Sequence, residues 1–253
     1  MPNHTSNILN ITGPKPLLDE IRAKHFRVPE GKTEPCLDFD TIIPMPKDLA
    51  DTVEGSGIAW GMDILNGKFD HLIRLAKDHP DDPLPEDLDI PTAIAIGLDW
   101  CPDVIAAGFQ GVRNLENHYA RSWYDWAKKN WGTKWNAYWG CINDPAEPFI
   151  EATYSTAWSP GSEAIDALAA MYPGAEFEHH FLDEGGGFAG TREYSAGELV
   201  SDTDIDWTFH ARNTFGMDTE EEDEEEEDKS TDDVPEPDPA TRMGMRPDSP
   251  WAF

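Results

Sequence analysis

The run Trp131-Gly132-Thr133-Lys134-Trp135-Asn136-Ala137 decides the fold of this chain, because the hydrophobic period changes there. Before the run, Tyr119, Trp123 and Trp126 are spaced i, i+4 and i+7, which places their side chains on one face of a helix. Over residues 135–141 every second residue is apolar or aromatic, the period of a β-strand. The pattern predicts a helix, a stop with positive φ at the glycine of the run, and a strand whose aromatic face packs back on the helix.

The other segments complete an α+β pattern. In chain order we expect a strand over 7–12, a helix ending near residue 26, the helix and strand on either side of the run, a strand over 149–156, a helix over 159–172, a strand over 176–182 and a strand over 192–194. This is the βαββαβ order of a ferredoxin-like sandwich, an antiparallel sheet with both helices on one face.

Four segments follow from this reading. Residues 1–200 form the ferredoxin-like domain, and a large, mainly helical insertion at about 27–130 interrupts it after the first helix. The structure of about residues 48–117 within the insertion is left open, because Gly and Pro punctuate short amphipathic pieces there and apolar residues are spread too evenly over 93–109. Residues 201–217 are expected to be a connecting segment. Residues 218–253 are expected to be a disordered acidic tail, because they are poor in apolar residues.

Composition narrows the class of protein. Hydrophobic residues make up 39% of the chain, and no run of about 18 apolar residues predicts a membrane span. The first ten residues lack the pattern of a secretory signal. The three cysteines are widely spaced, which disfavours a disulfide scaffold, a zinc ribbon and an iron–sulfur cluster. We therefore expect a cytoplasmic protein without a cofactor; the oligomeric state is left open.

Charge is the second strong feature, with a formal net charge of −31. Asp218 to Asp238 holds fourteen acidic residues and one lysine, and the rest of the chain still carries −18. Such a surface repels phosphates and disfavours nucleic-acid binding. It suits a basic protein surface of the host or a phage, although adaptation to a salty host would also explain it. The candidate partner-binding acidic residues of the tail are Glu220, Glu221, Glu222, Asp223, Glu224, Glu225, Glu226, Glu227 and Asp228.

Several segments together resemble a known family. These are the first strand and helix, the run Ile42-Ile43-Pro44-Met45-Pro46, the run from Trp131 to Ala137, and Gly185 to Gly190. Over about residues 4–200 they resemble the YubB-type ferredoxin-like domain proteins of phages and conjugative plasmids. The resemblance implies a ferredoxin-like fold without a cluster, a bacterial cytoplasm as the setting, and no established activity or catalytic residues. Its candidate family-motif residues are Trp131, Gly132, Thr133, Lys134, Trp135 and Asn136.

Motifs that suggest catalysis or metal binding have simpler interpretations. His179 and His180 precede two acidic residues, but neighbouring strand residues point to opposite faces and cannot readily share one ion. His179 instead shares a face with Phe177 and Phe181, which predicts a packed histidine. The segment 185–191 lacks the lysine of a phosphate-binding loop and precedes a strand, so we expect a loop with positive φ. No catalytic, cofactor-binding or metal-binding residue is predicted.

The sequence favours a non-catalytic binding module whose acidic surface engages a basic partner, with inhibition of a host nucleic-acid-processing or defence factor as a plausible outcome. One alternative is a single-stranded nucleic-acid-binding protein that uses sheet aromatics, for which the exposure of Trp131, Trp135 and Trp139 is the discriminating observation. Another is an enzyme with a site between the insertion and the sheet, using His179 together with Asp183 or Glu184.

Overall fold

The structure is a computed structural model that describes residues 3–52 and 55–217. Its strands are β1 (His4–Thr12), β2 (Phe26–Arg27), β3 (Cys36–Leu37), β4 (Tyr138–Ile142), β5 (Phe149–Ala157), β6 (Glu176–Asp183), β7 (Ala189–Ser195) and β8 (Glu198–Asp204). Its α-helices are α1 (Lys15–His25), α2 (Lys47–Ala50), α3 (Ser56–Leu65), α4 (Asp70–Leu75), α5 (Ile90–Trp100), α6 (Pro102–His118), α7 (Trp123–Asn130), α8 (Ser162–Met171) and α9 (Trp207–Asn213), with 3-10 helices η1 (Phe39–Thr41) and η2 (Ala76–Asp78).

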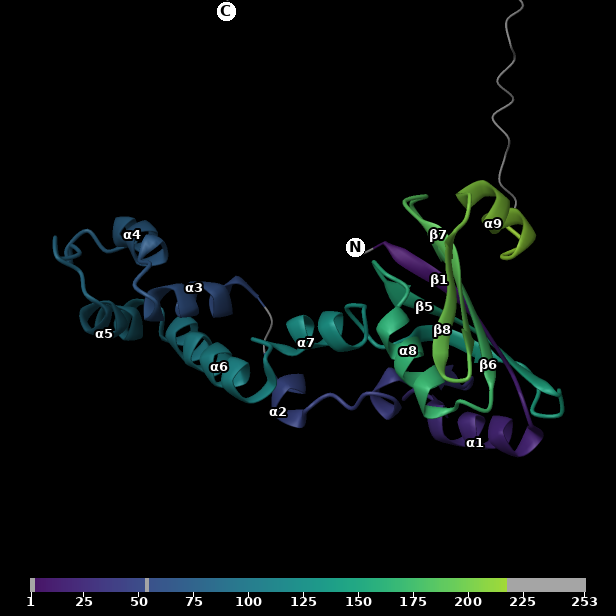
Figure 1. Cartoon of the computed structure of the whole chain (residues 1–253). Helices are drawn as coiled ribbons and strands as arrows, with labels where there is room; N and C mark the ends of the chain where they lie inside the picture. The colour runs from purple at the N-terminus through teal and green to yellow at the C-terminus, as the bar shows by residue number, and fades with distance from the viewer. Residues whose placement is uncertain (1–2, 53–54, 218–253) are drawn as a thin grey trace, which may run out of the picture. The chain divides into compact units, whose positions relative to one another are not determined.

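The main sheet has six antiparallel strands in the order β4-β5-β1-β6-β7-β8 (Figure 1). The elements β1, α1, β4, β5, α8 and β6 follow one another in the βαββαβ order, and their strands occupy the positions that a ferredoxin-like fold requires. The predicted fold class is therefore confirmed. The hairpin of β7 and β8 extends the sheet by two strands, of which only one was expected.

Helices α1 and α8 cover one face of this sheet because alternate strand residues are apolar. Leu9 and Ile11 of β1 are fully buried and share a core with Ile21 of α1 and Leu168 of α8. Each such side chain contributes about 1.5–3 kcal/mol when buried. Asn10, between the two β1 residues, must point to the opposite face.

Helix α9 covers one end of that opposite face. Ala211 of α9 packs against Leu182 and Ala189, and the indole N–H of Trp207 donates a 2.7 Å hydrogen bond to the carbonyl of Asp183. Residues 201–217, expected as a connecting segment, thus contain the end of β8 and a docked helix. The predicted acidic tail, residues 218–253, lies outside the described residues.

The insertion between α1 and β4 has a small core of its own, made by Ile64, Leu72, Ala93 and Ile105. Its α3 and α6 cross with their backbones in contact. A Cβ on Gly61 would lie 2.6 Å from the backbone nitrogen of Gly108. Apolar residues are spread evenly over 93–109 because two helices meet there. Helix α5 ends at Trp100, and α6 begins at Pro102, a residue suited to the first turn of a helix.

Two expectations about the aromatic segment are wrong. Tyr119 does not belong to the helix of Trp123 and Trp126, because it adopts a left-handed conformation (φ 55°) that ends α6. The strand after the run does not pack its aromatic face on that helix either. Trp139 has φ 53° within an irregular register of β4, and its side chain is 68% exposed. The positive φ expected at Gly132 is confirmed, at 75°.

We predict that Gly61→Ala destabilises the insertion by at least about 1–3 kcal/mol, because the added methyl group forces α3 and α6 apart. Hydrogen exchange of the α3 and α6 amides measures this effect directly. Gly57→Ala is the matched control: the same substitution lies on the same helix, with nothing within 4 Å of the added Cβ. Equal protection in the two variants would contradict the close crossing.

Candidate functional site

The run from Trp131 to Ala137 ties the insertion to the sheet. Trp131 is buried, and its indole N–H donates a 2.9 Å hydrogen bond to the carbonyl of Ile43. The hydroxyl of Thr133 donates to the carbonyl of Ala157 at 2.9 Å and accepts from the Ala157 N–H at 3.2 Å. These contacts join the end of α7 to the last residue of β5.

Asn136 joins the two ends of the insertion. Its Oδ1 accepts from the backbone N–H groups of Phe39, at 2.8 Å, and of Ala137, at 2.9 Å. Its Nδ2 donates to Asp38 Oδ1 at 2.7 Å. Asn136 therefore ties the turn before β4 to the segment around Asp38 and Phe39.

Asn136→Ala should lower the free energy of unfolding by about 2–3 kcal/mol, because the part-buried N–H of Phe39 loses its partner. Chemical denaturation monitored by tryptophan fluorescence checks this. Asn130→Ala, which removes one hydrogen bond within α7, should cost only about 0.5 kcal/mol. Similar losses in both variants would show that Asn136 does not close the insertion.

The groups suggested for an enzyme site are engaged separately. His179 is fully buried, with Nε2 lying 3.0 Å from Asn7 Oδ1 and 3.2 Å from the hydroxyl of Tyr154. Asp183 Oδ2 accepts from two backbone N–H groups of the glycine loop, at 3.0 and 3.1 Å. Glu184 accepts from the backbone of His4 at 2.7 Å. The packed histidine is confirmed, and among the described residues no hydrogen bond joins the three groups.

In the glycine loop, residues 185–190, two backbone N–H groups are occupied by the side chain of Asp183, which precedes the loop. The carboxylate of Asp183 bonds the N–H groups of Gly185 and Gly187, and Gly186 has φ 76°. The amides that would cradle a phosphate therefore already hold a carboxylate of the chain. The expected loop with positive φ is confirmed. No group of three or more His, Cys, Asp or Glu residues in the described ranges could hold a metal ion.

His179 gives a pH prediction. Burial, followed by the charges of Arg192 and His180, lowers the pKa of His179 to about 3. An unfolded histidine has a pKa of about 6.5, so between these values the unfolded chain binds more protons. Above about pH 6.5 His179 does not reduce the free energy of unfolding. Below that pH, protonation of His179 in the unfolded chain lowers the free energy of unfolding progressively. His179→Gln should reduce the loss of unfolding free energy between pH 7 and pH 5 by about 2 kcal/mol, measured by denaturant titration. An unchanged pH dependence would contradict a neutral buried His179.

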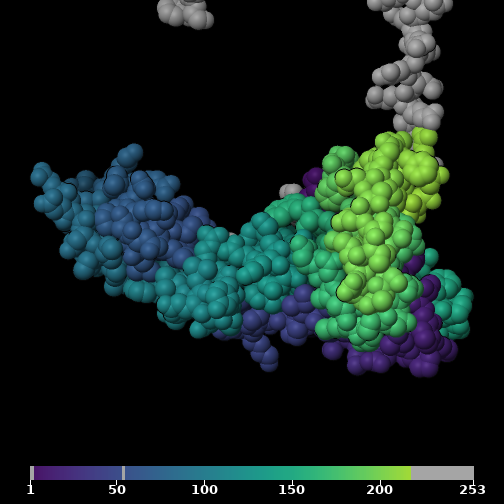
Figure 2. Space-filling model, in the orientation of Figure 1, coloured from purple at the N-terminus to yellow at the C-terminus, as the bar shows by residue number. Residues whose placement is uncertain are grey.

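The sheet face opposite α1 and α8 carries a row of glutamates. Asn10 of β1 pairs with Glu151 of β5 on one side and with Glu178 of β6 on the other, and Glu178 pairs in turn with Glu193 of β7. All three glutamates are exposed. A shallow depression of about 380 Å³ beside them is also lined by Glu176. Most residues of β8, the edge strand beside β7, are also exposed, and the surface over β8 is visible in Figure 2. We call the glutamates at positions 151, 178 and 193 the acidic row.

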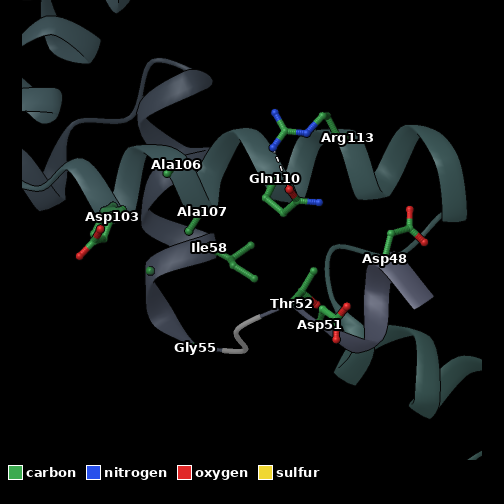
Figure 3. A pocket seen from close by; sticks show the side chains of 12 residues that line it. Asp48, Asp51, Thr52, Gly55, Ile58, Asp103, Ala106, Ala107, Gln110 and Arg113 are labelled. Carbon is green, nitrogen blue, oxygen red and sulfur yellow. Dashed lines mark hydrogen bonds between the residues drawn. The ribbon is translucent and has the colours of Figure 1, made fainter. Parts of the chain in front are cut away.

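A larger cavity of about 810 Å³ lies in the insertion between α2, α3 and α6 (Figure 3). Ile58, Ala106 and Ala107 form an apolar lining, and Asp51 and Asp103 are among the acidic residues at its border. This lining suits an apolar side chain of a ligand rather than acid–base chemistry. Sequence reasoning missed the cavity, because its residues come from helices that the spacing did not resolve.

Trp131, Trp135 and Trp139, whose exposure bears on binding to single-stranded nucleic acid, differ in how far they are buried. Trp131 is buried and structural, whereas Trp135 is 37% and Trp139 68% exposed. The Lys134 ammonium lies 4.7 Å from the Trp135 ring. The acidic candidates of the tail, Glu220 to Asp228, lie outside the described residues. In the part of the chain that is described, no helix is long and apolar enough to cross a membrane.

One comparison with known proteins, the match to a family model, supports the fold. A family model described as a ferredoxin-like domain in Api92-like protein matches residues 134–232. Among solved structures, the chain is similar to the crystal structure of protein api92 from Yersinia pseudotuberculosis. Sequence identity is 12%, the match covers 81% of this chain and 98% of that chain, and the TM-score is 0.40, so neither fold nor function is inferred from this similarity. No curated protein matches the chain. The family model thus indicates a ferredoxin-like domain without an established function.

Proposed function

We propose that this chain is a non-catalytic binding module whose acidic surface engages a basic partner protein. The acidic row carries the proposal, since the described helices leave it exposed on an otherwise regular sheet. Its carboxylates offer several acceptors at fixed strand spacing, which suits lysine and arginine side chains. In line with the resemblance to YubB-type proteins, we further propose that a phage or plasmid encodes the protein and that it acts in the host cytoplasm.

Repulsion within the acidic row supports this role. Glu178 and Glu193 occupy directly opposite positions on adjacent strands, an arrangement in which like charges destabilise a sheet. In the free protein, the imidazole of His180 lies 3.2 Å from one oxygen of Glu178. A cationic side chain of a partner placed between the two carboxylates would remove the repulsion. Binding would then be favoured both by the attraction of the cation to the two carboxylates and by the loss of their mutual repulsion.

The charge of the whole chain extends the argument. At −31 the chain attracts basic surfaces over a distance, and the tail residues Glu220 to Asp228 add a dense run of carboxylates. Proteins that process nucleic acids present basic grooves to phosphates, and an acidic chain competes for such grooves. Inhibition of a host nucleic-acid-processing or defence factor is the outcome we propose.

The test is capture of partners from a bacterial lysate by the full chain and by the triple variant Glu151→Gln, Glu178→Gln, Glu193→Gln. The wild type should retain at least one basic protein at about 0.05 M salt and release it at about 1 M, where the Debye length falls to about 3 Å. The triple variant should lose that protein, identified by mass spectrometry.

A second triple variant, Glu30→Gln, Glu86→Gln, Glu116→Gln, removes the same charge from exposed positions outside the sheet. It should retain the partner, because the acidic row is intact. If both triple variants lost the partner equally, net charge alone would hold the partner, and the acidic row would have no specific role. If capture is independent of salt, or nothing basic is retained, the proposal is wrong, and adaptation to a salty host would then account for the acidity.

A further inference from the structure

A strip made of two groups of aromatic rings, with Lys134 between them, lies at the opposite end of β1 from the acidic row. We call it the aromatic strip: His4, Tyr124, Trp135, Tyr138, Trp139 and Trp158. The ring of Trp139 lies 4.9 Å from that of His4 and 5.0 Å from that of Tyr138, which in turn lies 6.2 Å from Trp135. Trp158 lies 6.2 Å from Tyr124. The strip draws on β1, β4, α7 and the end of β5, so sequence spacing alone could not assemble it.

Lys134 joins the two halves of the strip. Its ammonium lies 4.7 Å from the ring of Trp135, 4.6 Å from that of Trp158 and 5.8 Å from that of Tyr124. Lys128 lies 5.1 Å from the ring of Tyr124. Among the described residues neither lysine forms a salt bridge, so both charges are available to an anionic ligand.

The two most exposed residues of the aromatic strip have a strained backbone conformation. Trp139 has φ 53° and Trp158 has φ 71°, a region that bulky residues rarely adopt. Their side chains are 68% and 43% exposed, so burial does not offset that conformation. Glycine would adopt the same backbone without strain. Strain of this kind, held at exposed aromatic residues, is typical of functional surfaces.

We propose that the aromatic strip binds single-stranded nucleic acid. Unpaired bases stack on exposed tryptophan rings whatever their sequence, and lysines beside the rings neutralise the phosphates. The rings follow one another at spacings that a flexible strand can match, whereas the stacked bases of a duplex offer them no free face. This surface lies at the edge and end of the sheet, not on the sheet face where sequence reasoning sought it.

The acidity of the chain does not prevent this binding. His4 lies six positions along β1 from Asn10, which pairs with Glu151 and Glu178 of the acidic row, a distance of about 20 Å at the rise of a strand. That is roughly two Debye lengths at physiological salt, so the repulsion is largely screened. Two acidic residues lie beside the strip: Glu184 accepts a hydrogen bond from the backbone of His4, and Glu34 lines a pocket together with Tyr138 and Trp139. A cationic ligand is disfavoured here because Lys134 already occupies the space between the rings.

The experiment uses the full chain and a labelled oligothymidylate of about ten nucleotides, with fluorescence anisotropy at about 50 mM salt. Trp139→Gly and Trp158→Gly should each weaken binding roughly tenfold or more. Both variants should stay folded, because glycine relieves the positive φ. Lys134→Gln should weaken binding and reduce the salt dependence by about one phosphate contact.

Matched controls are available in the same chain. Tyr119→Gly replaces another exposed aromatic residue with positive φ, outside the strip, and should bind as the wild type does. Lys129→Gln, next to Tyr119, is the control for charge. The triple glutamine variant of the acidic row should bind the oligonucleotide at least as tightly as the wild type, which separates this proposal from the proposed function.

Three results would overturn the proposal. The first is no binding of the oligonucleotide by the wild type at low salt. The second is equal binding by the Trp139→Gly, Trp158→Gly and Tyr119→Gly variants. The third is quenching of tryptophan fluorescence by a soluble oligosaccharide but not by the oligonucleotide, which would assign the strip to sugar rings.

Discussion

Closure of the insertion by Asn136 is the interaction on which the rest of this structure depends. Its contact with Phe39 joins residues 97 positions apart, and closing a flexible loop of that length costs about 4 kcal/mol of chain entropy. The hydrogen bonds of Asn136, the buried indole of Trp131 and the paired backbone of Ala157 offset that cost. With both ends fixed, the insertion can carry its own core without disturbing the sheet.

The closed insertion leaves a sheet with two different ends. At one end a row of glutamates crosses β5, β6 and β7, and at the other a strip of aromatic rings holds Lys134. The two surfaces suit ligands of opposite charge, and screening lets them act independently. A protein that binds both a basic protein and a single strand would be suited to interfere where such a protein meets nucleic acid.

Much of the fold could be predicted because it rests on local periodicity. The βαββαβ order, the positive φ of Gly132 and the buried His179 follow from spacings within a few residues. Strand β8 was missed because it is an exposed edge strand with little apolar alternation. Tyr119 and Trp139 were misplaced because a single residue with positive φ ends a helix or bends a strand, and spacing does not reveal it in a residue other than glycine.

The sequence by itself determined the class of fold, the charge and the place where the insertion rejoins the sheet, because these depend on composition and short-range period. Only the tertiary structure decided which aromatic residues are structural and which are exposed. Trp131 and Trp135 lie in the same run, yet one is buried beneath Ile43 and the other flanks Lys134. Burial depends on which distant segments pack there: Ile43, whose carbonyl accepts the hydrogen bond from the Trp131 indole, lies 88 positions away in the chain.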